Sequence, residues 1–162
     1  MKSNQGFTLV ELLVVIIIIG ILSAIALPSF LGQASKARQS EAKLTVANAI
    51  KSQNIYFLEN QTFTGDWGEM GLGLYKETAN YKYDLLRTEP KGQLTEQIVL
   101  AIPRNKDLRA YAGGLQVVER SNNPTVVSVV CEAKKPLIQL SEKSIVFGER
   151  DVKCGDDARE MR

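Results

Sequence analysis

The sequence contains no histidine, and only two of its 162 residues are cysteines, Cys131 and Cys154. Without histidine, the chain has no imidazole general base, no Ser-His-Asp or Cys-His nucleophile and no histidine-ligated metal. The two cysteines are too few for a structural zinc site and too far apart for a CxxC redox pair. A disulfide bond in an oxidising compartment and two free buried thiols both remain possible, and we favour the bond. We expect no enzyme, no cofactor and no metal.

The chain also lacks a strong net charge. Twenty Lys and Arg oppose eighteen Asp and Glu, which leaves a formal charge of +2. This charge is too small and too dispersed to predict binding by counterion release, so nucleic acid is not expected as a direct partner. Asp156 and Asp157 lie in a tail of mixed charge, which is more typical of a solvated surface than of a catalytic or calcium site.

The sequence does have one long apolar segment. From Phe7 to Leu27, twenty-one residues carry a single charge, that of Glu11. As a helix, this segment is about 30 Å long, which is enough to cross a membrane. It is interpreted as a cleaved signal peptide, a permanent anchor, or a segment that lies in lipid for only part of its existence. Lys2, the apolar run Leu12–Leu22 and the small-x-small pattern Ala24-Ile25-Ala26 fit a signal peptide.

Glu11 argues against the first two interpretations. A carboxylate at the start of the apolar run opposes insertion and gives no benefit to a peptide that is discarded. An isolated anchor gains nothing from it either, because intramembrane charges usually pair with another helix or chain. We therefore predict that Glu11 has a partner outside its own helix.

The stretch Gly6-Phe7-Thr8-Leu9-Val10-Glu11-Leu12-Leu13-Val14, preceded by a short hydrophilic leader with Lys2, resembles the class III signal of type IV prepilins and pseudopilins. The resemblance implies that a prepilin peptidase cuts between Gly6 and Phe7 and methylates the new amino terminus at Phe7. It also implies that Glu11 is the assembly glutamate of that family. Gly20 and Pro28 match positions where the family has a glycine and a proline.

The chemistry of these residues is consistent with that implication. Cleavage after Gly6 keeps the apolar helix on the mature chain and creates an amine at Phe7. A bond from Glu11 to the Phe7 amine of a neighbouring subunit would fix the axial register of helices whose aliphatic faces alone would slide. Pro28, with Gly20 and Gly32, makes bending or local melting of the helix easy.

Basic residues around the segment disagree with the expected orientation. Lys2 precedes it, whereas Lys36, Arg38 and Lys43 follow it, so the positive-inside rule places the carboxyl end in the cytoplasm. The resemblance implies a cytoplasmic leader and a translocated domain. Large domains translocate largely regardless of charge, and a disulfide needs an oxidising compartment. We therefore predict a single-pass inner-membrane precursor and an extracellular filament.

Helical character continues from Ser29 to Asn60, where no further proline occurs. One face is apolar and is expected in the core: Leu44, Ala47, Ile50, Ile55, Phe57 and Leu58. The opposite face is polar and is expected in solvent: Lys36, Arg38, Gln39, Glu41, Lys43 and Gln53. Residues 60–73 are predicted to form a loop pinned by Phe63 and Trp67.

Four short segments have strand character: Tyr81–Leu86, Gln97–Ile102, Ala110–Val118 and Thr125–Cys131. Their short connections, such as the turn Ser121–Pro124, predict an antiparallel meander with its apolar face on the helix. Gly113-Gly114 indicates a bulge or a close backbone contact. The tail from Pro136 is predicted to be loop except for Ser144–Phe147, and a Cys131–Cys154 bond would tie it to the sheet edge.

We thus predict an α+β, pilin-like lollipop with four parts: a leader (1–6), a transmembrane and filament-core helix (7–28), an amphipathic helix half (29–59) and a globular region (60–162). A looser likeness to cyanobacterial pilin-like proteins involves Tyr56-Phe57, Gly71-Leu72-Gly73 and Tyr111-Ala112-Gly113-Gly114. The expected function is that of a type IV pilus subunit in a homo-oligomeric filament, with adhesion and twitching motility as family roles. A type II secretion pseudopilin and a minor pilin are the alternatives. The expected partners are the prepilin peptidase, the assembly machinery and, before assembly, membrane lipid.

Overall fold

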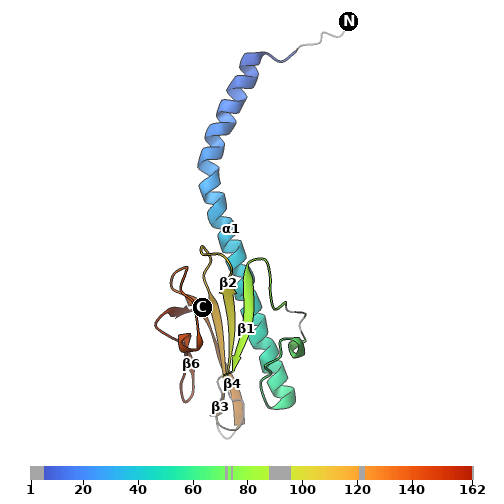
Figure 1. Ribbon diagram of the computed structural model, residues 1–162, viewed down its shortest axis with the longest axis vertical. Coiled ribbons are helices and arrows are strands. Elements are labelled where there is room, and N and C mark those ends of the chain that lie inside the picture. The colour runs from blue at the N-terminus through green and yellow to red at the C-terminus, as the bar shows by residue number, and fades with distance from the viewer. Residues whose placement is uncertain (1–5, 72, 74, 88–95, 121–122, 162) are drawn as a thin grey trace. The chain divides into compact units, whose positions relative to one another are not determined.

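The computed structural model describes residues 6–71, 73, 75–87, 96–120 and 123–161, and a boundary after Ala37 divides the chain into two units (Figure 1). The leader residues 1–5 with Lys2, Leu72 of the Gly71–Gly73 pattern, and Ser121-Asn122 of the expected turn lie outside the described residues. Helix α1 (Leu9–Asn60) begins in the first unit and ends in the second.

The first unit is the amino-terminal part of α1. The large apolar residues of this segment are all exposed, with exposed fractions between 44% at Val15 and 81% at Leu9. Pro28 lies inside the helix, which is continuous through it. A Cβ atom added at Gly20 or Gly32 would meet nothing within 4 Å. The predicted ease of bending at Gly20 and Pro28 therefore stays a prediction.

The second unit combines the carboxyl half of α1 with a five-stranded sheet. The strands are β1 (Tyr81–Arg87), β2 (Glu96–Pro103), β3 (Tyr111–Arg120), β4 (Asn123–Ala133) and β7 (Ala158–Glu160). Their order is β1-β2-β3-β4-β7 and every pair is antiparallel, which confirms the predicted meander. The short helices η1 (Gly68–Met70) and η2 (Glu142–Ser144) and the hairpin β5 (Ile145–Phe147) and β6 (Val152–Cys154) complete the unit.

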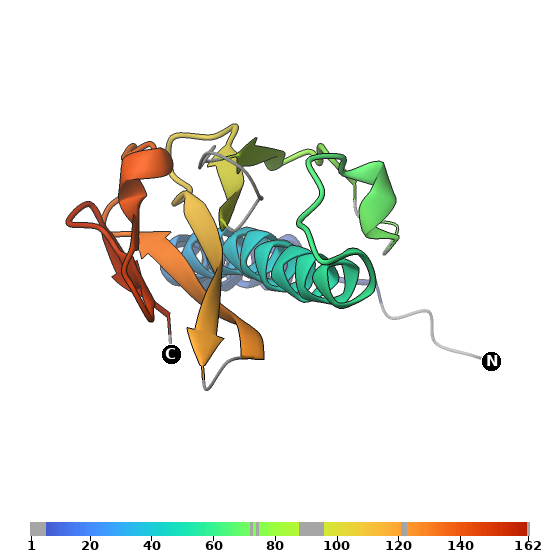
Figure 2. The same ribbon diagram turned by 90° about the horizontal axis from the view of Figure 1, so that it is seen from below.

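Apolar side chains cover both faces of this sheet. Val99, Tyr111 and Leu115 pack on α1, while Ile98, Leu100 and other side chains of the opposite face pack on the carboxyl-terminal region. Figure 2 shows the β5–β6 hairpin, in red, and the carboxyl half of α1 on opposite sides of the sheet. The prediction of one covered face was incomplete. The continuous run Ile98–Ile102 carries the signal for burial on both faces, because a half-exposed strand alternates with polar residues.

The buried stripe of α1 differs from the predicted one. Ile50 and Phe57 are buried as expected, but Leu44, Ile55 and Leu58 are 53–70% exposed. Small residues are frequent among those that α1 buries, and Val46 and Ile50 contact β3 at Gly113. The buried residues are Ala42, Val46, Ala49, Ile50, Ser52, Gln53 and Phe57. The prediction weighed hydrophobicity, whereas a close helix–sheet contact selects for small side chains.

Gln53 was predicted to be solvated and is instead fully buried. Its side-chain amide donates to the carbonyl of Thr64 at 2.8 Å, and its side-chain oxygen accepts from the Thr64 amide at 3.0 Å. The loop after α1 supplies this partner, so the polar group is satisfied inside the protein. Phe63 is buried in the same loop and Trp67 packs on the core, which confirms that they pin it.

Gly113-Gly114 is a place of close approach. A Cβ at Gly113 would lie 2.6 Å from Ile50 Cδ1 of α1, and one at Gly114 would lie 2.6 Å from Ile145 Cγ2 of β5. The two glycines thus let layers approach β3 from both sides. Of the two alternatives predicted for Gly113-Gly114, a bulge or a close contact, the structure supports the close contact.

The tail contains more structure than predicted. Besides β5, which overlaps the expected Ser144–Phe147 segment, it forms β6 and β7. Strand β7 pairs with Cys131–Ala133 of β4, so β7 and not β4 ends the sheet on that side. The disulfide between Cys131 and Cys154 therefore joins β6 to β4, which is the second strand from that edge and not the edge strand. The whole unit is α+β with pilin-like architecture, as predicted.

Candidate functional site

The amino-terminal part of α1 is the first candidate site. It is long and apolar enough to cross a membrane, and none of its most apolar eighteen-residue window is buried within the protein. Exposing this much aliphatic surface to water is unfavourable, at roughly 25 cal/mol for each Å². The segment therefore requires lipid or other protein around it.

Thr8 and Glu11 form a capping box at the start of this segment. The Thr8 hydroxyl accepts from the Glu11 amide at 3.2 Å, and Glu11 Oε2 accepts from the Thr8 amide at 2.9 Å and from its hydroxyl at 2.7 Å. This arrangement satisfies donors at a helix start that have no partner within the helix. The pattern Thr-x-x-Glu was present in the sequence, but Thr8 was not recognised as a functional residue.

The capping box gives Glu11 a partner within its own helix. An isolated helix therefore does gain from this carboxylate, contrary to our expectation, whereas the predicted partner outside the helix stays a prediction. Both capping bonds to Glu11 use Oε2, so Oε1 can accept from a second donor. The capping bonds also survive cleavage before Phe7, because the peptide bond between Phe7 and Thr8 stays intact.

The predicted cleavage residues lie just before the helix. Gly6 and Phe7 precede α1, and the Phe7 side chain is 86% exposed. A Cβ at Gly6 would meet nothing within 4 Å, so the fold does not require glycine there. A requirement for Gly6 would then come from a protease that must accommodate the backbone.

The predicted disulfide between Cys131 and Cys154 is present in the structure, with 5.7 Å between the two Cα atoms. It joins β4 to β6. Beside it on β4, Glu132 accepts hydrogen bonds from Tyr111 at 3.1 Å and Arg159 at 2.7 Å and pairs with Arg109 at 3.1 Å. Sequence reasoning missed this network, because its members come from separate strands and loops.

The Glu132 network lowers the pKa of its carboxyl group. Burial alone would raise that pKa, but the hydrogen bonds from Arg159 and Tyr111 and the charges of Arg109 and Arg159 outweigh it. Burial, together with the nearby Glu132 charge, raises the pKa of Tyr111. These groups therefore hold β3, β4 and β7 together and keep fixed ionisation states near neutral pH.

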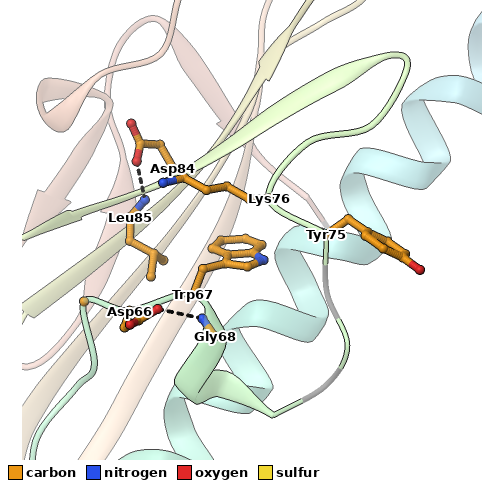
Figure 3. Close-up of a pocket in the computed structure, with 8 residues that line it drawn as sticks. Asp66, Trp67, Gly68, Tyr75, Lys76, Asp84 and Leu85 are labelled. Carbon is orange, nitrogen blue, oxygen red and sulfur yellow. Dashed lines mark hydrogen bonds between the residues drawn. The ribbon is translucent and has the colours of Figure 1, made fainter.

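A surface pocket of about 540 Å³ lies between the loop after α1 and β1 (Figure 3). Trp67 and Leu85 give it an apolar wall, and the Trp67 ring stacks on Tyr83 with 5.9 Å between centroids. The carboxylates of Asp66 and Asp84 accept from backbone amides of Gly68 and Leu85 at 2.8 and 3.1 Å. The Asp66 carboxylate thus serves a local turn and the Asp84 carboxylate serves the backbone of β1. The described lining residues include no nucleophile with an adjacent base.

The tail acids do not form a metal site. Asp157 accepts from the Ser144 hydroxyl at 2.6 Å, and the Asp156 carbonyl accepts from Lys134 at 2.7 Å. Across the described ranges, no group of three or more candidate ligands could hold a metal ion. Of the regions described above, the first unit, whose apolar helix starts with a capping box, is the strongest candidate for a functional site.

An exposed apolar helix half, joined to a half that packs on an antiparallel meander, defines a class of membrane-anchored pilin-like subunits. The chain belongs to the type IV pilin-like G and H family, whose model matches residues 39–155. A second family model, the prokaryotic N-terminal methylation motif, matches residues 1–27. The two matches together cover both units.

Individual relatives support the same family. The chain is 41% identical to the type IV major pilin protein PilA of Myxococcus xanthus, over 42% of this chain and 31% of that protein. It is 33% identical to the type IV wide pilus major component PilA4 of Thermus thermophilus, over 53% of this chain and 66% of that protein. It is 36% identical to the type II secretion system core protein G of Vibrio cholerae, over 42% of this chain and 47% of that protein. The matches thus span less than two thirds of each relative.

Proposed function

We propose that this protein is the structural subunit of a type IV pilus. Its precursor is a single-pass inner-membrane protein that a prepilin peptidase cleaves after Gly6 and methylates at Phe7. The assembly machinery then moves it from lipid into an extracellular homo-oligomeric filament. One observation carries this proposal: an exposed apolar helix bears a carboxylate, Glu11, at its very start.

Transfer from lipid to filament follows from the surface chemistry. Lipid chains and neighbouring apolar helices both cover the aliphatic segment, so the transfer changes little in hydrophobic burial. Glu11 favours the filament over the lipid bilayer, because only in the filament can it pair with the Phe7 amine of another subunit. The second unit also leaves Leu44, Ile55 and Leu58 exposed, which suits contact with neighbouring subunits.

Variants at the capping box test the proposal. Glu11→Gln keeps an oxygen that can accept the capping bond but removes the charge. Thr8→Ala removes the two capping bonds of the Thr8 hydroxyl, but it keeps the bond from the residue-8 backbone amide to Glu11 and keeps the charge. We expect both variants to reach the membrane and to be cleaved after Gly6. Glu11→Gln should fail to form filaments, whereas Thr8→Ala should assemble with a helix weakened by about 1 kcal/mol.

The readout is an immunoblot of membrane and sheared-surface fractions. Glu11→Ala serves as the reference, because it removes the charge and the two capping bonds that Glu11 Oε2 accepts, and it should also fail to assemble. Normal surface filaments built from Glu11→Ala alone would contradict the proposed role. Filaments from Glu11→Gln but not from Thr8→Ala would assign Glu11 to capping and not to pairing.

A pseudopilin of a type II secretion system is the second candidate, and the similarity to the Vibrio cholerae core protein G favours it. Both candidates share the amino-terminal motif. They differ in the product, because a pilin should be abundant in filaments sheared from the cell surface. Its absence there, together with a defect in protein secretion on deletion, would favour the pseudopilin or a minor pilin.

A further inference from the structure

One end of the sheet in the second unit carries several exposed cations. The connection between β2 and β3 contributes Arg104 and Lys106, and the segment after β4 contributes Lys134 and Lys135. The two segments are adjacent, since both line a groove of about 210 Å³ that includes Arg104, Lys106 and Leu137. We call the four cations and Leu137 the basic end.

Leu137 is unusual in conformation and in exposure. Its φ angle is +71°, in the left-handed region, and its side chain is 70% exposed. Bulky residues rarely adopt this conformation, which costs of order 1–3 kcal/mol. The protein therefore holds an apolar side chain in water, beside cations, at a conformational cost.

The basic end lies where α1 enters the second unit. The hydroxyl of Tyr111, the first residue of β3, donates to Glu132 and also lies 3.4 Å from the side-chain oxygen of Gln39, and Asn80 donates to Glu41 at 2.9 Å. Eight residues separate Gln39 from Leu31, where the exposed apolar segment ends, and in helical form they span about 12 Å. The headgroup layer is roughly 5–8 Å thick, so the length of chain keeps this end close to the headgroups of any bilayer that α1 crosses.

Acidic residues at the same end are largely engaged. Glu77 pairs with Arg104, Glu41 accepts from Asn80, and Glu132 pairs with Arg109 and Arg159. Asp107 is exposed beside Lys106, and Asp156 is exposed next to Lys134, whose amine donates to the Asp156 carbonyl. In the part of the chain that the structure describes, Lys106 and Lys135 take part in no ion pair, so their charges face solvent.

We propose that the basic end docks on the anionic lipid headgroups of the membrane that anchors the precursor. The cations bind headgroup phosphates and Leu137 enters the interface, the combination by which basic amphipathic surfaces bind lipid. This inference rests on the proposed membrane-anchored function. Anionic headgroups would also bind Lys36 and Arg38, whose position after the apolar segment conflicts with the positive-inside rule in the expected orientation.

Hydrogen exchange of the full-length protein in nanodiscs tests the docking. One set of nanodiscs contains phosphatidylglycerol and the other only phosphatidylcholine. We expect peptides covering residues 103–109 and 134–139 to exchange more slowly in phosphatidylglycerol. The double variant Lys106→Gln/Lys135→Gln should weaken docking about 30-fold and bring exchange to the phosphatidylcholine rate. Leu137→Gly should also reduce the protection, without lowering the thermal midpoint.

The double variant Lys51→Gln/Arg120→Gln is the matched control. It removes the same charge from exposed positions near the carboxyl end of α1 and at the opposite end of β3, and it should keep the protection. Equal wild-type exchange in the two lipids, or equal loss of protection in both double variants, overturns the docking. Peptides from residues 9–27 report insertion separately. Fast exchange there would contradict the membrane-anchored function, whereas slow exchange there with an unprotected basic end would contradict only the docking.

Discussion

Glu132 shows how a single buried carboxylate can join three strands. It lies on β4, accepts from Tyr111 of β3 and Arg159 of β7, and is only 9% exposed. An unpaired charge at this depth would be costly, but the surrounding donors satisfy it. Its value to the fold therefore depends on its ionisation.

Glu132→Gln should remove a pH-dependent part of the stability. Because the folded pKa lies below its ordinary value of 4.5, the unfolded chain binds the proton more readily. The stabilisation is full above that value and is lost as the pH falls through the folded pKa. At pH 7 the variant should be less stable by about 1–3 kcal/mol, and less sensitive to acid. Urea unfolding in detergent between pH 3 and 7 measures both, and Glu119→Gln, an exposed control, should keep the wild-type pH dependence.

Gly113 offers a second test at the residue scale. In Gly113→Ala the new Cβ would lie 2.6 Å from Ile50 Cδ1 and 2.9 Å from Val46 Cγ1, so these side chains or the helix that carries them must shift. We expect a loss of about 1–3 kcal/mol in unfolding free energy. Ile50→Val removes the Cδ1 atom, so the double variant should lose less than the sum of the two single changes. Strict additivity would contradict the close-contact explanation.

Residue patterns located the exposed apolar segment, but they did not predict individual side-chain contacts. Glu11 was singled out because a lone carboxylate conflicts with an apolar segment, which is a local signal. Gln53 was misassigned because its partner, Thr64, lies on a loop whose path a helical pattern does not contain. Thr8 could have been recognised from the Thr-x-x-Glu spacing, since a capping box is local.

At the scale of elements, the disulfide connects the carboxyl-terminal hairpin to β4. Cys131 and Cys154 are separated by 23 positions. Closing a loop of this length removes conformational freedom from the unfolded chain and contributes roughly 3 kcal/mol. The hairpin β5–β6 is short, so it depends on this constraint more than the longer strands do.

Reduction of the disulfide should therefore loosen the carboxyl-terminal strands first. We expect faster hydrogen exchange in β5, β6 and β7 and a stability loss of roughly 3 kcal/mol, with β1–β3 still protected. The variant Cys131→Ser/Cys154→Ser should not respond to reductant. Alkylatable thiols in freshly isolated protein would show that the bond does not form in the cell.

Long elements were predictable from sequence, and short ones were not. The four meander strands were found within three residues of their ends because their β-branched and aromatic residues repeat over many positions. Strands β6 and β7 have three residues each, too few to show a period. Strand β7 exists because it pairs with Cys131–Ala133, a partner far away in the sequence.

At the scale of the whole molecule, processing separates the proposed pilin from an exported protein with an ordinary signal peptide. Mass spectrometry and amino-terminal sequencing of the mature protein should find methylated Phe7. Gly6→Val should accumulate as uncleaved precursor while its second unit keeps the wild-type fold, because no atom lies within 4 Å of the added Cβ. A mature chain that begins at Leu27 would restore the signal-peptide interpretation.

The two-sided sheet has a consequence for the order in which the chain becomes protected during its synthesis. The helix that covers one face is made before any strand, whereas Leu140, Ile145 and Val152, which cover the other face, are among the last residues made. Until these last residues have been synthesised, the second face of the sheet, which includes Ile98 and Leu100, stays exposed to solvent. A nascent chain thus passes through a stage in which the four-stranded meander is complete but one apolar face is exposed. At this stage the chain is most prone to aggregate and most dependent on chaperones.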